Sequence, residues 1–576
     1  MSQDTSPDQS SKTLPTVRLG STVRPLDHQL PLPKSRLIVE EQPDDEAVPM
    51  DVVFVGGGCA GLAGAIELAR LVKEDNEKGG GIGEIEIGVL EKAGALGEHT
   101  LSGAVMNPRA LRELFPDKSD AELPLGTPVR NEAVYFMTEG RAQRIPTPPT
   151  MKNHGNVSVS LAEVVRWMGE QAEAMGVNVF PGFPVESLLV EGSNVIGVRT
   201  VPSGLDRDGN PSAPDAMPAM DITGRVTVLS EGTRGMLSQA WYDWQNVRSD
   251  NPQIYALGVK ELWEVKKPLD RVIHTLGWPL PRDAFGGSWA YPQGDNLVSL
   301  GLVVGLDYED ARLDVHELLQ RMKLHPLFRE ILEGGEMVEW GAKTIPEGGF
   351  HALPSRMHGD GICVVGDSVG FVDVPSLKGI HYSMQSGIYA ARAIFEALKK
   401  DDTSEAGLAG YTKTVRESYI AKDMKKTRNM RLAFKRGFWS GSVKAGLMTV
   451  TGGAFPGGRI AHDEDAADTK HLNGEAHGAH GPFVPDGKLT FSKVDAVFKS
   501  GNQTRDDIPS HLIVGEDVTP EMAEMLENLC PAGVYERDGE KLIVNAPNCV
   551  DCKATDVIGP RWTPREGGAG PAYRRM

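Results

Sequence analysis

Residues 51–62, with the sequence DVVFVGGGCAGL, decide the fold of the first part of this chain. An apolar, β-branched run is followed by the pattern G-x-G-x-x-G at Gly56, Gly58 and Gly61, and then by a helical pattern. In such a strand–turn–helix unit the first glycine permits the turn, the second lets a pyrophosphate approach the backbone, and the third lets the helix pack closely on the strand. Free N–H groups at the turn, that of Gly57 included, then face the phosphates. We therefore predict a dinucleotide site, with an ordinary glycine-rich turn as the alternative.

The next expected strand, residues 85–90, ends at Glu91, where a carboxylate can accept hydrogen bonds from the ribose hydroxyls of an adenosine. Glu91 lies thirty positions after Gly61, later than the roughly 20 residues usual for this pattern, and a glycine-rich insert at 74–83 accounts for the difference. We place Glu91 and the adjacent Lys92 in the cofactor site.

A second motif, residues 361–367 with the sequence GICVVGD, ends an apolar strand at Asp367. A carboxylate in this position can hold the hydroxyls of a ribityl chain. A helix that begins near Gly379 can direct its positive N-terminal end at the electron-rich edge of a reduced flavin. The two motifs together predict FAD rather than a nicotinamide. No second G-x-G-x-x-G follows a strand, so we expect no separate NAD(P)H domain.

The composition is that of an ordinary soluble globular protein, with 40% hydrophobic and 24% charged residues in a chain long enough for about three or four domains. The net charge of −19 argues against nucleic acid as a partner, because phosphates need a basic face. Five cysteines do not make a disulfide framework. Residues 1–50 are polar, proline-rich and acidic, without the pattern of a signal or transit peptide, and we expect a loosely ordered cytoplasmic tail.

The block 255–306 contains several strand-like segments rich in aromatic residues, and we expect a β-rich second domain there. Within it, Gly286 and Gly287 are flanked by Phe285 and Trp289. Two adjacent glycines are typical of a hairpin turn, but two exposed N–H groups could equally hydrogen-bond a carbonyl in an apolar pocket. From these residues alone both interpretations stay open.

The stretch 413–436 is strongly basic in an otherwise acidic chain, and it leads into an apolar segment at 437–450. Local positive charge beside exposed apolar side chains suits a membrane surface, but a solvated helix followed by a buried loop explains the pattern as well. A shorter amphipathic segment, residues 108–115, is by itself more typical of a surface helix that packs on the core.

Three of the five cysteines fall in the last fifty residues, as Cys530 and the pair Cys549-x-x-Cys552. This spacing suits an iron–sulfur cluster or a zinc ion, and three unrelated thiols are the alternative. A cysteine at position 555 would continue the C-x-x-C-x-x-C series, but the residue there is Thr555. Three thiolates are one short of a four-cysteine site.

Together these motifs resemble the electron-transfer flavoprotein–ubiquinone oxidoreductase family, over nearly the whole chain from about residue 51 to residue 576. The most specific pieces are Glu91-Lys92 with His99-Thr-Leu-Ser-Gly103, Asn153-His-Gly-Asn156, Trp167–Glu173, Gly258–Trp263, Gly301–Tyr308, Cys530–Tyr535 and Glu566–Tyr573. The resemblance implies an α/β plus α+β architecture. A Rossmann-like FAD domain of the glutathione-reductase type would carry an inserted β-rich quinone domain and a C-terminal ferredoxin-like domain.

The expected division of the chain follows from the motifs and this resemblance. It comprises a polar N-terminal tail at 1–50, an FAD-binding domain at 51–133, 221–250 and 345–400, a β-rich quinone domain at 134–220 and 251–344, a basic helix and membrane-contact segment at 401–460, a linker at 461–482, and a ferredoxin-like iron–sulfur domain at 483–576.

The resemblance implies a membrane-associated enzyme that passes electrons from reduced electron-transfer flavoprotein through FAD and an iron–sulfur cluster to ubiquinone. On the matching positions, Gly56, Gly58, Gly61, Glu91 and Asp367 would hold FAD, Gly286 and Gly287 would donate hydrogen bonds to a quinone carbonyl, and Cys530, Cys549 and Cys552 would ligate a [4Fe–4S] cluster. The segments 108–115 and 437–450 would contact the membrane. We expect a monotopic protein on the cytoplasmic face of a bacterial inner membrane.

Thr555 departs from the family, which carries its fourth cysteine there. The cluster could then be [3Fe–4S], or [4Fe–4S] with water, Thr555 or Asp556 on one iron, or absent.

Two other functions stay open. An FAD-dependent reductase of an isoprenoid or other lipid, fed by a ferredoxin or a flavoprotein, would share the FAD motifs and an apolar pocket. The cysteine module and the pair Gly286–Gly287 favour the quinone reductase. A non-enzymatic electron carrier that has lost its cluster is the third hypothesis, and only Thr555 supports it.

Overall fold

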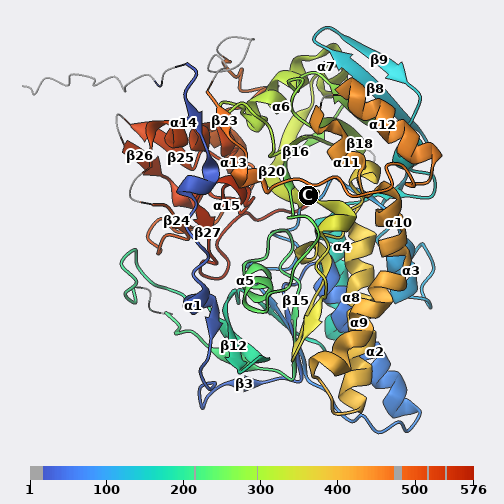
Figure 1. The fold of residues 1–576 in the computed structure, drawn as a ribbon, viewed down its shortest axis with the longest axis vertical. Helices are drawn as coiled ribbons and strands as arrows, with labels where there is room; N and C mark the ends of the chain where they lie inside the picture. The colour runs from blue at the N-terminus through green and yellow to red at the C-terminus, as the bar shows by residue number, and fades with distance from the viewer. Residues whose placement is uncertain are drawn as a thin grey trace, which may run out of the picture.

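The computed structural model of the chain describes residues 17, 19–212, 214, 216–294, 296–436, 438–472, 483–515, 518–538 and 541–576. Residue 437 of the expected membrane segment and residues 473–482 of the expected linker lie outside these ranges. The protein has two large sheet-based regions, one above the other in Figure 1, and a C-terminal module beside them.

The nucleotide-type region is built on a six-stranded sheet. Its strand order is β11 (Asn178–Pro181), β5 (Ile87–Glu91), β4 (Val52–Val55), β15 (Val226–Leu229), β22 (Ile362–Val364) and β21 (His358–Gly359). The first five strands are parallel, and β21 is antiparallel. All four residues of β4 are buried, as expected for a parallel strand covered on both faces. Helices α2 (Cys59–Glu77), α4 (Leu161–Ala174) and α8 (Ile380–Lys399) pack against this core.

A smaller five-stranded sheet flanks the first one. Its order is β2 (Ile38–Val39), β12 (Val185–Glu191), β13 (Asn194–Thr200), β14 (Asp221–Thr223) and β3 (Val48–Pro49). The prediction of a loose N-terminal tail is therefore wrong for residues 38–49, because two short strands there complete the edges of this sheet. Farther upstream, β1 (Thr22–Val23) pairs with β23 (Lys470–His471).

The expected assignment of all of 134–220 to the second domain also needs correction, because only its first part, up to residue 145, belongs to the seven-stranded sheet described below. The helix α4 and the strand β11 lie within 134–220, but they belong to the six-stranded sheet and its covering layer. The reason is the parallel pairing of β11 with β5, which places the segment beside the nucleotide turn rather than in the second domain.

The second region is a seven-stranded sheet. Its order is β20 (Glu336–Pro346), β16 (Tyr255–Glu264), β19 (Leu297–Gly305), β18 (Gly286–Pro292), β17 (Val272–Gly277), β8 (Glu132–Thr138) and β9 (Arg141–Ile145). Only β8 and β17 pair in parallel. Helices α6 (Val315–Leu324) and α7 (Pro326–Leu332) share the core on one side of this sheet. The β-rich block expected around 255–306 is its centre.

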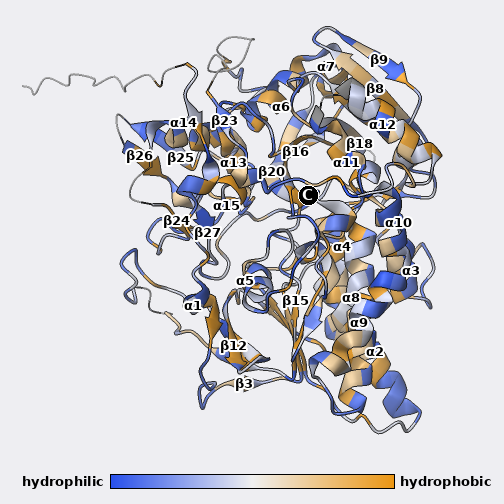
Figure 2. Ribbon diagram, viewed as in Figure 1, coloured by the Kyte–Doolittle hydropathy of each residue, from blue (hydrophilic) through white to orange (hydrophobic). Residues whose placement is uncertain are grey.

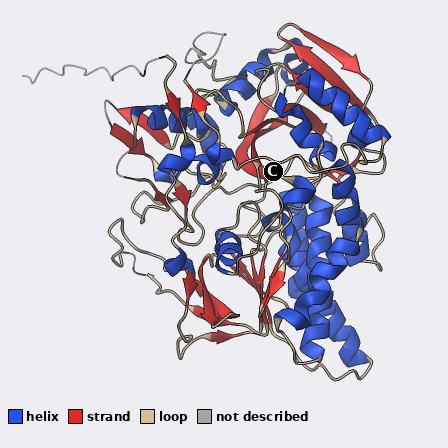
Figure 3. Cartoon of the chain, in the orientation of Figure 1, coloured by secondary structure: helices blue, strands red, loops and turns tan. Residues whose placement is uncertain are grey.

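The C-terminal module contains small two-stranded pairings and short helices (Figure 3). The strands are β24 (Leu512–Ile513) with β27 (Arg561–Trp562), and β25 (Tyr535–Asp538) with β26 (Lys541–Val544); the helices are α13 (Lys493–Phe498), α14 (Pro520–Leu529) and α15 (Ala554–Ile558). The module shares a continuous apolar core with the seven-stranded sheet. The last residues then return to the middle of the molecule, where the backbone N–H of Ala162 donates to the carbonyl of Met576 over 3.1 Å.

The helices α10 (Tyr419–Thr427) and α12 (Phe438–Val450) lie along one side of the molecule (Figure 1). Figure 2 shows hydrophilic colour on α10 and mixed colour on α12. Within the described ranges, no helix is both long and apolar enough to cross a membrane.

Candidate active site

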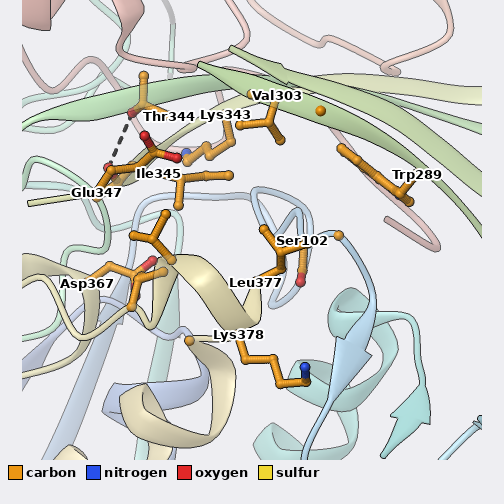
Figure 4. A pocket seen from close by; sticks show the side chains of 18 of the residues that line it. Ser102, Trp289, Val303, Lys343, Thr344, Ile345, Glu347, Asp367, Leu377 and Lys378 are labelled. Carbon is orange, nitrogen blue, oxygen red and sulfur yellow. Dashed lines mark hydrogen bonds between the residues drawn. The ribbon is translucent and has the colours of Figure 1, made fainter. Parts of the chain in front are cut away.

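A cavity of about 1500 Å³ lies between the two large sheets, at the carboxyl ends of β4 and β5 and against β18 (Figure 4). Open parallel sheets bind ligands at the carboxyl ends of their strands, so the position is that of a nucleotide site. The wall is contributed by the glycine turn, the loop 99–104, the start of α8 and the seven-stranded sheet.

Two of the three glycines in the turn lack space for a Cβ atom, as the sequence pattern implied. Gly56 has a φ of 114°, and a Cβ there would overlap the carbonyl oxygen of Ser230. A Cβ at Gly61 would overlap the carbonyl oxygen of Gly56. At Gly58, by contrast, a Cβ would meet no atom within 4 Å. Gly58 is the N-cap of α2 and lines the cavity, so the space over it is open to a ligand.

Glu91 lies in the cavity wall at the end of β5, as predicted. Its carboxylate accepts hydrogen bonds from the backbone N–H groups of Gly57 and Ala93, each over 2.9 Å. These two bonds fix the carboxylate beside the glycine turn and leave acceptor capacity for hydroxyls.

Asp367 and Gly379 also meet at the cavity, although they come from different elements. Asp367 follows β22, and its carboxylate accepts a hydrogen bond of 2.9 Å from the Ser383 hydroxyl in the first turn of α8. Burial raises the pKa of Asp367. Gly379 is the N-cap of the 20-residue helix α8, whose positive end therefore points at the cavity beside Asp367. The cavity is therefore lined by an open glycine turn, two carboxylates and the N-terminal end of a helix. This set of hydrogen-bond donors and acceptors fits FAD.

Lys92 lines the cavity, but its side-chain ammonium has a partner outside the nucleotide region. This ammonium forms an ion pair with Asp551 of the C-terminal module and lies 4.9 Å from the centre of the Trp562 ring. Two more lysines stand in the same wall. The Nζ of Lys343 donates to the Asp551 carbonyl over 3.1 Å, and Lys553 lies 4.6 Å from the Trp562 ring centre. Positively charged side chains thus separate the cavity from the cysteine loop.

Gly286 and Gly287 begin β18 at the far part of the same cavity. A Cβ at Gly286 would overlap the Val303 carbonyl oxygen, and a Cβ at Gly287 would lie 2.6 Å from the Thr275 carbonyl oxygen. The register between β17 and β18 ends at the pair Thr275–Ser288, so both glycines lie beyond that pairing. The hairpin interpretation is wrong, because these glycines form the start of a strand.

A histidine that sequence reasoning passed over stands in the same part of the wall. His274 is buried, its Nδ1 is 3.1 Å from the Tyr291 hydroxyl, and its Nε2 has no hydrogen-bond partner among the described residues. Burial, assisted by the charge of Lys378, lowers the pKa of His274 to about 3, so the ring is neutral. In the sequence, only the position of this histidine within an apolar strand segment could have indicated that it is buried.

The three C-terminal cysteines are buried, as a metal centre requires. Cys530 follows α14, while Cys549 and Cys552 bracket a tight loop before α15. Burial and the nearby Asp551 raise the pKa of Cys549 to about 12, so a thiolate there needs a metal ion to stabilise it. Three soft donors in one buried module fit an iron–sulfur cluster.

Two residues beside these cysteines were not expected. Ligand atoms of His511, Cys549 and Asp551 all lie within 4.8 Å of one another. Asp551 also accepts hydrogen bonds of 3.0 Å from Trp562 and from Arg565. Trp562 and Arg565 follow Asp551 by only 11 and 14 positions. Its ion-pair partner Lys92, however, lies 459 positions before it, and nothing in the sequence indicated that contact.

Thr555, at the position where the resemblance implies a fourth cysteine, lies buried in α15. The other candidate oxygen ligand, Asp556, is engaged elsewhere: its carboxylate pairs with Arg234 at 2.5 Å and accepts from the Trp562 N–H at 3.2 Å. The prediction that Asp556 could serve as a ligand is therefore not supported, since an ion pair already uses the group.

The two segments expected to contact a membrane, 108–115 and 437–450, differ in how far their apolar side chains are exposed. Leu111, Leu114 and Phe115 are buried in the core, and Phe115 packs on the Trp167 ring with centroids 4.8 Å apart. The interpretation of 108–115 as a surface helix that packs on the core is therefore confirmed, and its apolar face is not available to a membrane. On α12 the side chains of Val443, Leu447 and Val450 are 67%, 47% and 87% exposed. The opposite side of α12 lines the cavity through residues that include Ala445, Gly446 and Thr449.

Comparisons with known proteins agree with this geometry. The family model for the ubiquinone-binding domain of ETF-QO matches residues 255–345, and the model described as electron transfer flavoprotein-ubiquinone oxidoreductase, 4Fe-4S, matches residues 487–574. The first range includes both glycines of β18, and the second includes the three cysteines.

Similar curated proteins are mitochondrial electron transfer flavoprotein-ubiquinone oxidoreductases. The proteins of Dictyostelium discoideum, Caenorhabditis elegans and Bos taurus are each 37% identical to this chain. The matches cover 93%, 91% and 91% of this chain, and 92%, 92% and 89% of the respective relative. A solved structure of a geranylgeranyl bacteriochlorophyll reductase-like protein from Thermoplasma acidophilum aligns with a TM-score of 0.54 at 18% identity, over 70% of this chain and 92% of that one. At that identity the likeness concerns the fold alone.

Proposed function

The chain belongs to the electron-transfer flavoprotein–ubiquinone oxidoreductase family, and on this premise we propose that it takes electrons from reduced electron-transfer flavoprotein and delivers them through FAD and an iron–sulfur cluster to ubiquinone. One observation carries the proposal. A single cavity contains the glycine turn, Asp367 and the pair Gly286–Gly287, and its wall touches the cysteine loop.

Within this cavity the residues have separate roles. Gly56, Gly58 and Gly61 admit the pyrophosphate to the start of α2, Glu91 accepts ribose hydroxyls, and Asp367 with the Gly379 end of α8 holds the ribityl and flavin part. FAD supplies the link between a donor that gives single electrons and an acceptor that takes two. Gly286 and Gly287 bind a quinone carbonyl through backbone N–H groups. Neither position admits a Cβ, because it would meet the carbonyl oxygen of Val303 or of Thr275 in a neighbouring strand.

Cys530, Cys549 and Cys552 hold the cluster, and Thr555 stands at the remaining corner. We propose a cluster whose fourth iron is either missing or bound by a weak oxygen ligand. If the fourth iron is missing, Thr555→Cys should raise the iron content from about three to about four per protein and abolish an EPR signal of the oxidised state. If an oxygen ligand already holds that iron, the substitution should change the EPR spectrum of the reduced cluster. An unchanged iron content and unchanged spectra would contradict this role for position 555.

The quinone tail reaches the cavity from a membrane surface. The cavity-lining side of α12 is continuous with an outer side of exposed Val443, Leu447 and Val450, and the exposed lysines Lys422, Lys425 and Lys426 lie on the neighbouring helix α10. Apolar side chains beside positive charge favour an anionic bilayer surface. We place the protein as a monotopic enzyme on the cytoplasmic face of a bacterial inner membrane. Arg431 contributes nothing to this surface, because it is buried in ion pairs with Asp307 and Glu347.

The direct test is anaerobic turnover of the purified protein, with reduced electron-transfer flavoprotein as donor and ubiquinone-1 as acceptor. We expect quinone-dependent oxidation of the donor, with FAD and iron both present in the protein. Bound FAD without quinone reduction would overturn the proposal. Reduction of an isoprenoid double bond in place of the quinone would establish the lipid reductase instead.

A further inference from the structure

Reduction of a quinone to a quinol consumes two protons as well as two electrons, and the protons must come from water. We propose that they enter the main cavity through a smaller adjoining pocket, by way of Asp373 and then Lys378. This inference rests on the proposed quinone reductase activity. None of the residues involved has a role in the cofactor sites described above.

The adjoining pocket has a volume of about 490 Å³ and shares four lining residues with the main cavity: Thr150, Lys378, Met430 and Thr449. The remainder of its lining is largely polar and includes the exposed side chains of Lys152, His154 and Lys426. Water therefore reaches this pocket, and Lys378 stands in the wall that divides it from the main cavity (Figure 4).

A tight turn holds Asp373 and Lys378 together. The N–H of Asp373 donates to the Lys378 carbonyl over 2.9 Å, and the N–H of Lys378 donates back over 3.3 Å. The Ser376 hydroxyl donates to one carboxylate oxygen of Asp373 over 2.5 Å, and the Lys378 ammonium donates to the Ser376 carbonyl over 2.8 Å. The other carboxylate oxygen of Asp373 is buried and has no partner among the described residues. One polar turn thus connects the wet pocket with the apolar cavity.

The charges around these two groups suit proton exchange near neutral pH. Burial raises the pKa of Asp373; the hydroxyls of Ser376 and Thr427 and the charge of Lys378 oppose this rise, and Asp423 adds to it. Burial lowers the pKa of Lys378 to about 8, against the charges of Asp373 and Glu132. A group whose pKa lies near the working pH can both release and regain a proton.

The carboxylates of Glu139 and Asp283 also line the main cavity, but neither of them lines the adjoining pocket as Lys378 does. His274 is neutral and stands next to Thr275, whose carbonyl borders Gly287. In the proposed sequence Lys378 releases a proton toward the quinone, and Asp373 returns one to Lys378 through water in the adjoining pocket, which both side chains line. Solvent water then restores Asp373. Two such cycles supply one proton to each quinone oxygen, while the two electrons come from the reduced donor protein.

The test compares two acceptors in the holoenzyme. Ubiquinone-1 takes protons with its electrons, whereas a ferrocenium salt takes electrons alone. In Lys378→Arg the side chain keeps its charge but cannot release a proton, because the guanidinium stays protonated. We expect the ratio of quinone to ferrocenium turnover to fall at least tenfold in Lys378→Arg and in Asp373→Asn, with a larger solvent deuterium isotope effect. Asp373→Glu should recover part of the quinone rate.

The outcomes separate the inference from the proposed function. An unchanged ratio in Lys378→Arg would overturn the inference, since charge alone would then suffice. An equal loss with both acceptors would also overturn it, because the turn would then serve only the structure. If Asp373→Asn fails to fold, Lys378→Arg still decides. Wild-type protein that reduces ferrocenium but not quinone would refute the proposed function itself.

Discussion

The ion pair between Lys92 and Asp551 joins the nucleotide region to the cysteine loop, and it supports a quantitative prediction. The Asp551 side chain is 1% exposed, and the Lys92 side chain is 27% exposed. In Lys92→Met the Asp551 carboxylate keeps Trp562 and Arg565 as donors but loses its partner from the residue that follows β5. The variant therefore tests whether the ion pair holds the loop against the rest of the protein.

The expected cost follows from burial and from the partners that remain. Breaking a buried ion pair without compensation costs about 3–5 kcal/mol, and a single hydrogen bond to a charged group is worth about 1.5–3 kcal/mol. Because two donors remain and water screens the partly exposed lysine, we expect about 2 kcal/mol for local opening of the loop. At 1.4 kcal/mol for each factor of ten, this corresponds to roughly 30-fold faster exchange.

Hydrogen exchange followed by mass spectrometry measures this opening directly, on a peptide that covers residues 549–556 of the holoenzyme. The matched control is Lys73→Met, whose lysine is 74% exposed and lies 4.0 Å from Glu77. We expect less than 0.5 kcal/mol, about a twofold change, for the control. If exchange of the loop in Lys92→Met stays within the range of the control, the ion pair does not hold the two regions together and the reasoning is refuted.

Three further predictions concern the cofactor site, pH and the membrane. Gly58→Ala should leave the fold intact but lower the FAD content severalfold, because the added Cβ would enter only the open ligand space. Gly140→Ala, where a Cβ is equally free of contacts, is the control and should keep full FAD. A normal FAD content in Gly58→Ala would contradict the assignment of Gly58 to the cofactor site. Burial holds the pKa of both His274 and His381 at about 3, so below about pH 6.5 the unfolded chain binds protons that the folded chain does not. The contribution of each histidine to the unfolding free energy should be constant above about pH 6.5 and fall toward pH 4 by up to about 1.4 kcal/mol per pH unit. Urea titrations should give a shallower slope for His274→Gln, and an unchanged slope would exclude its contribution. Leu447→Asp should weaken flotation with anionic vesicles severalfold, and undiminished flotation would remove α12 from the membrane contact.

Local patterns in the sequence determined a large part of the site. The glycine turn at 56–61 was predictable because steric limits and backbone N–H groups act within a few residues of one another. Asp367 was predictable because a strand followed by Gly-Asp and a helix is likewise a local arrangement. The spacing of the three cysteines was enough to propose them as metal ligands, because soft donors have few other reasons to occur at that spacing.

Only the tertiary structure decided which partner each of these groups meets. Lys92 was assigned to the cofactor from its neighbour Glu91, yet its ammonium pairs with Asp551, 459 positions away. Leu111 and Phe115 carry the same amphipathic signal as a membrane helix, and packing against the core buried them. Residues 38–49 look polar and loose in the sequence, but their two short strands, β2 and β3, pair with β12 and β14 at the edges of the five-stranded sheet. Periodicity marks which face of an element is apolar, whereas the surface that covers this face is set by contacts between distant parts of the chain.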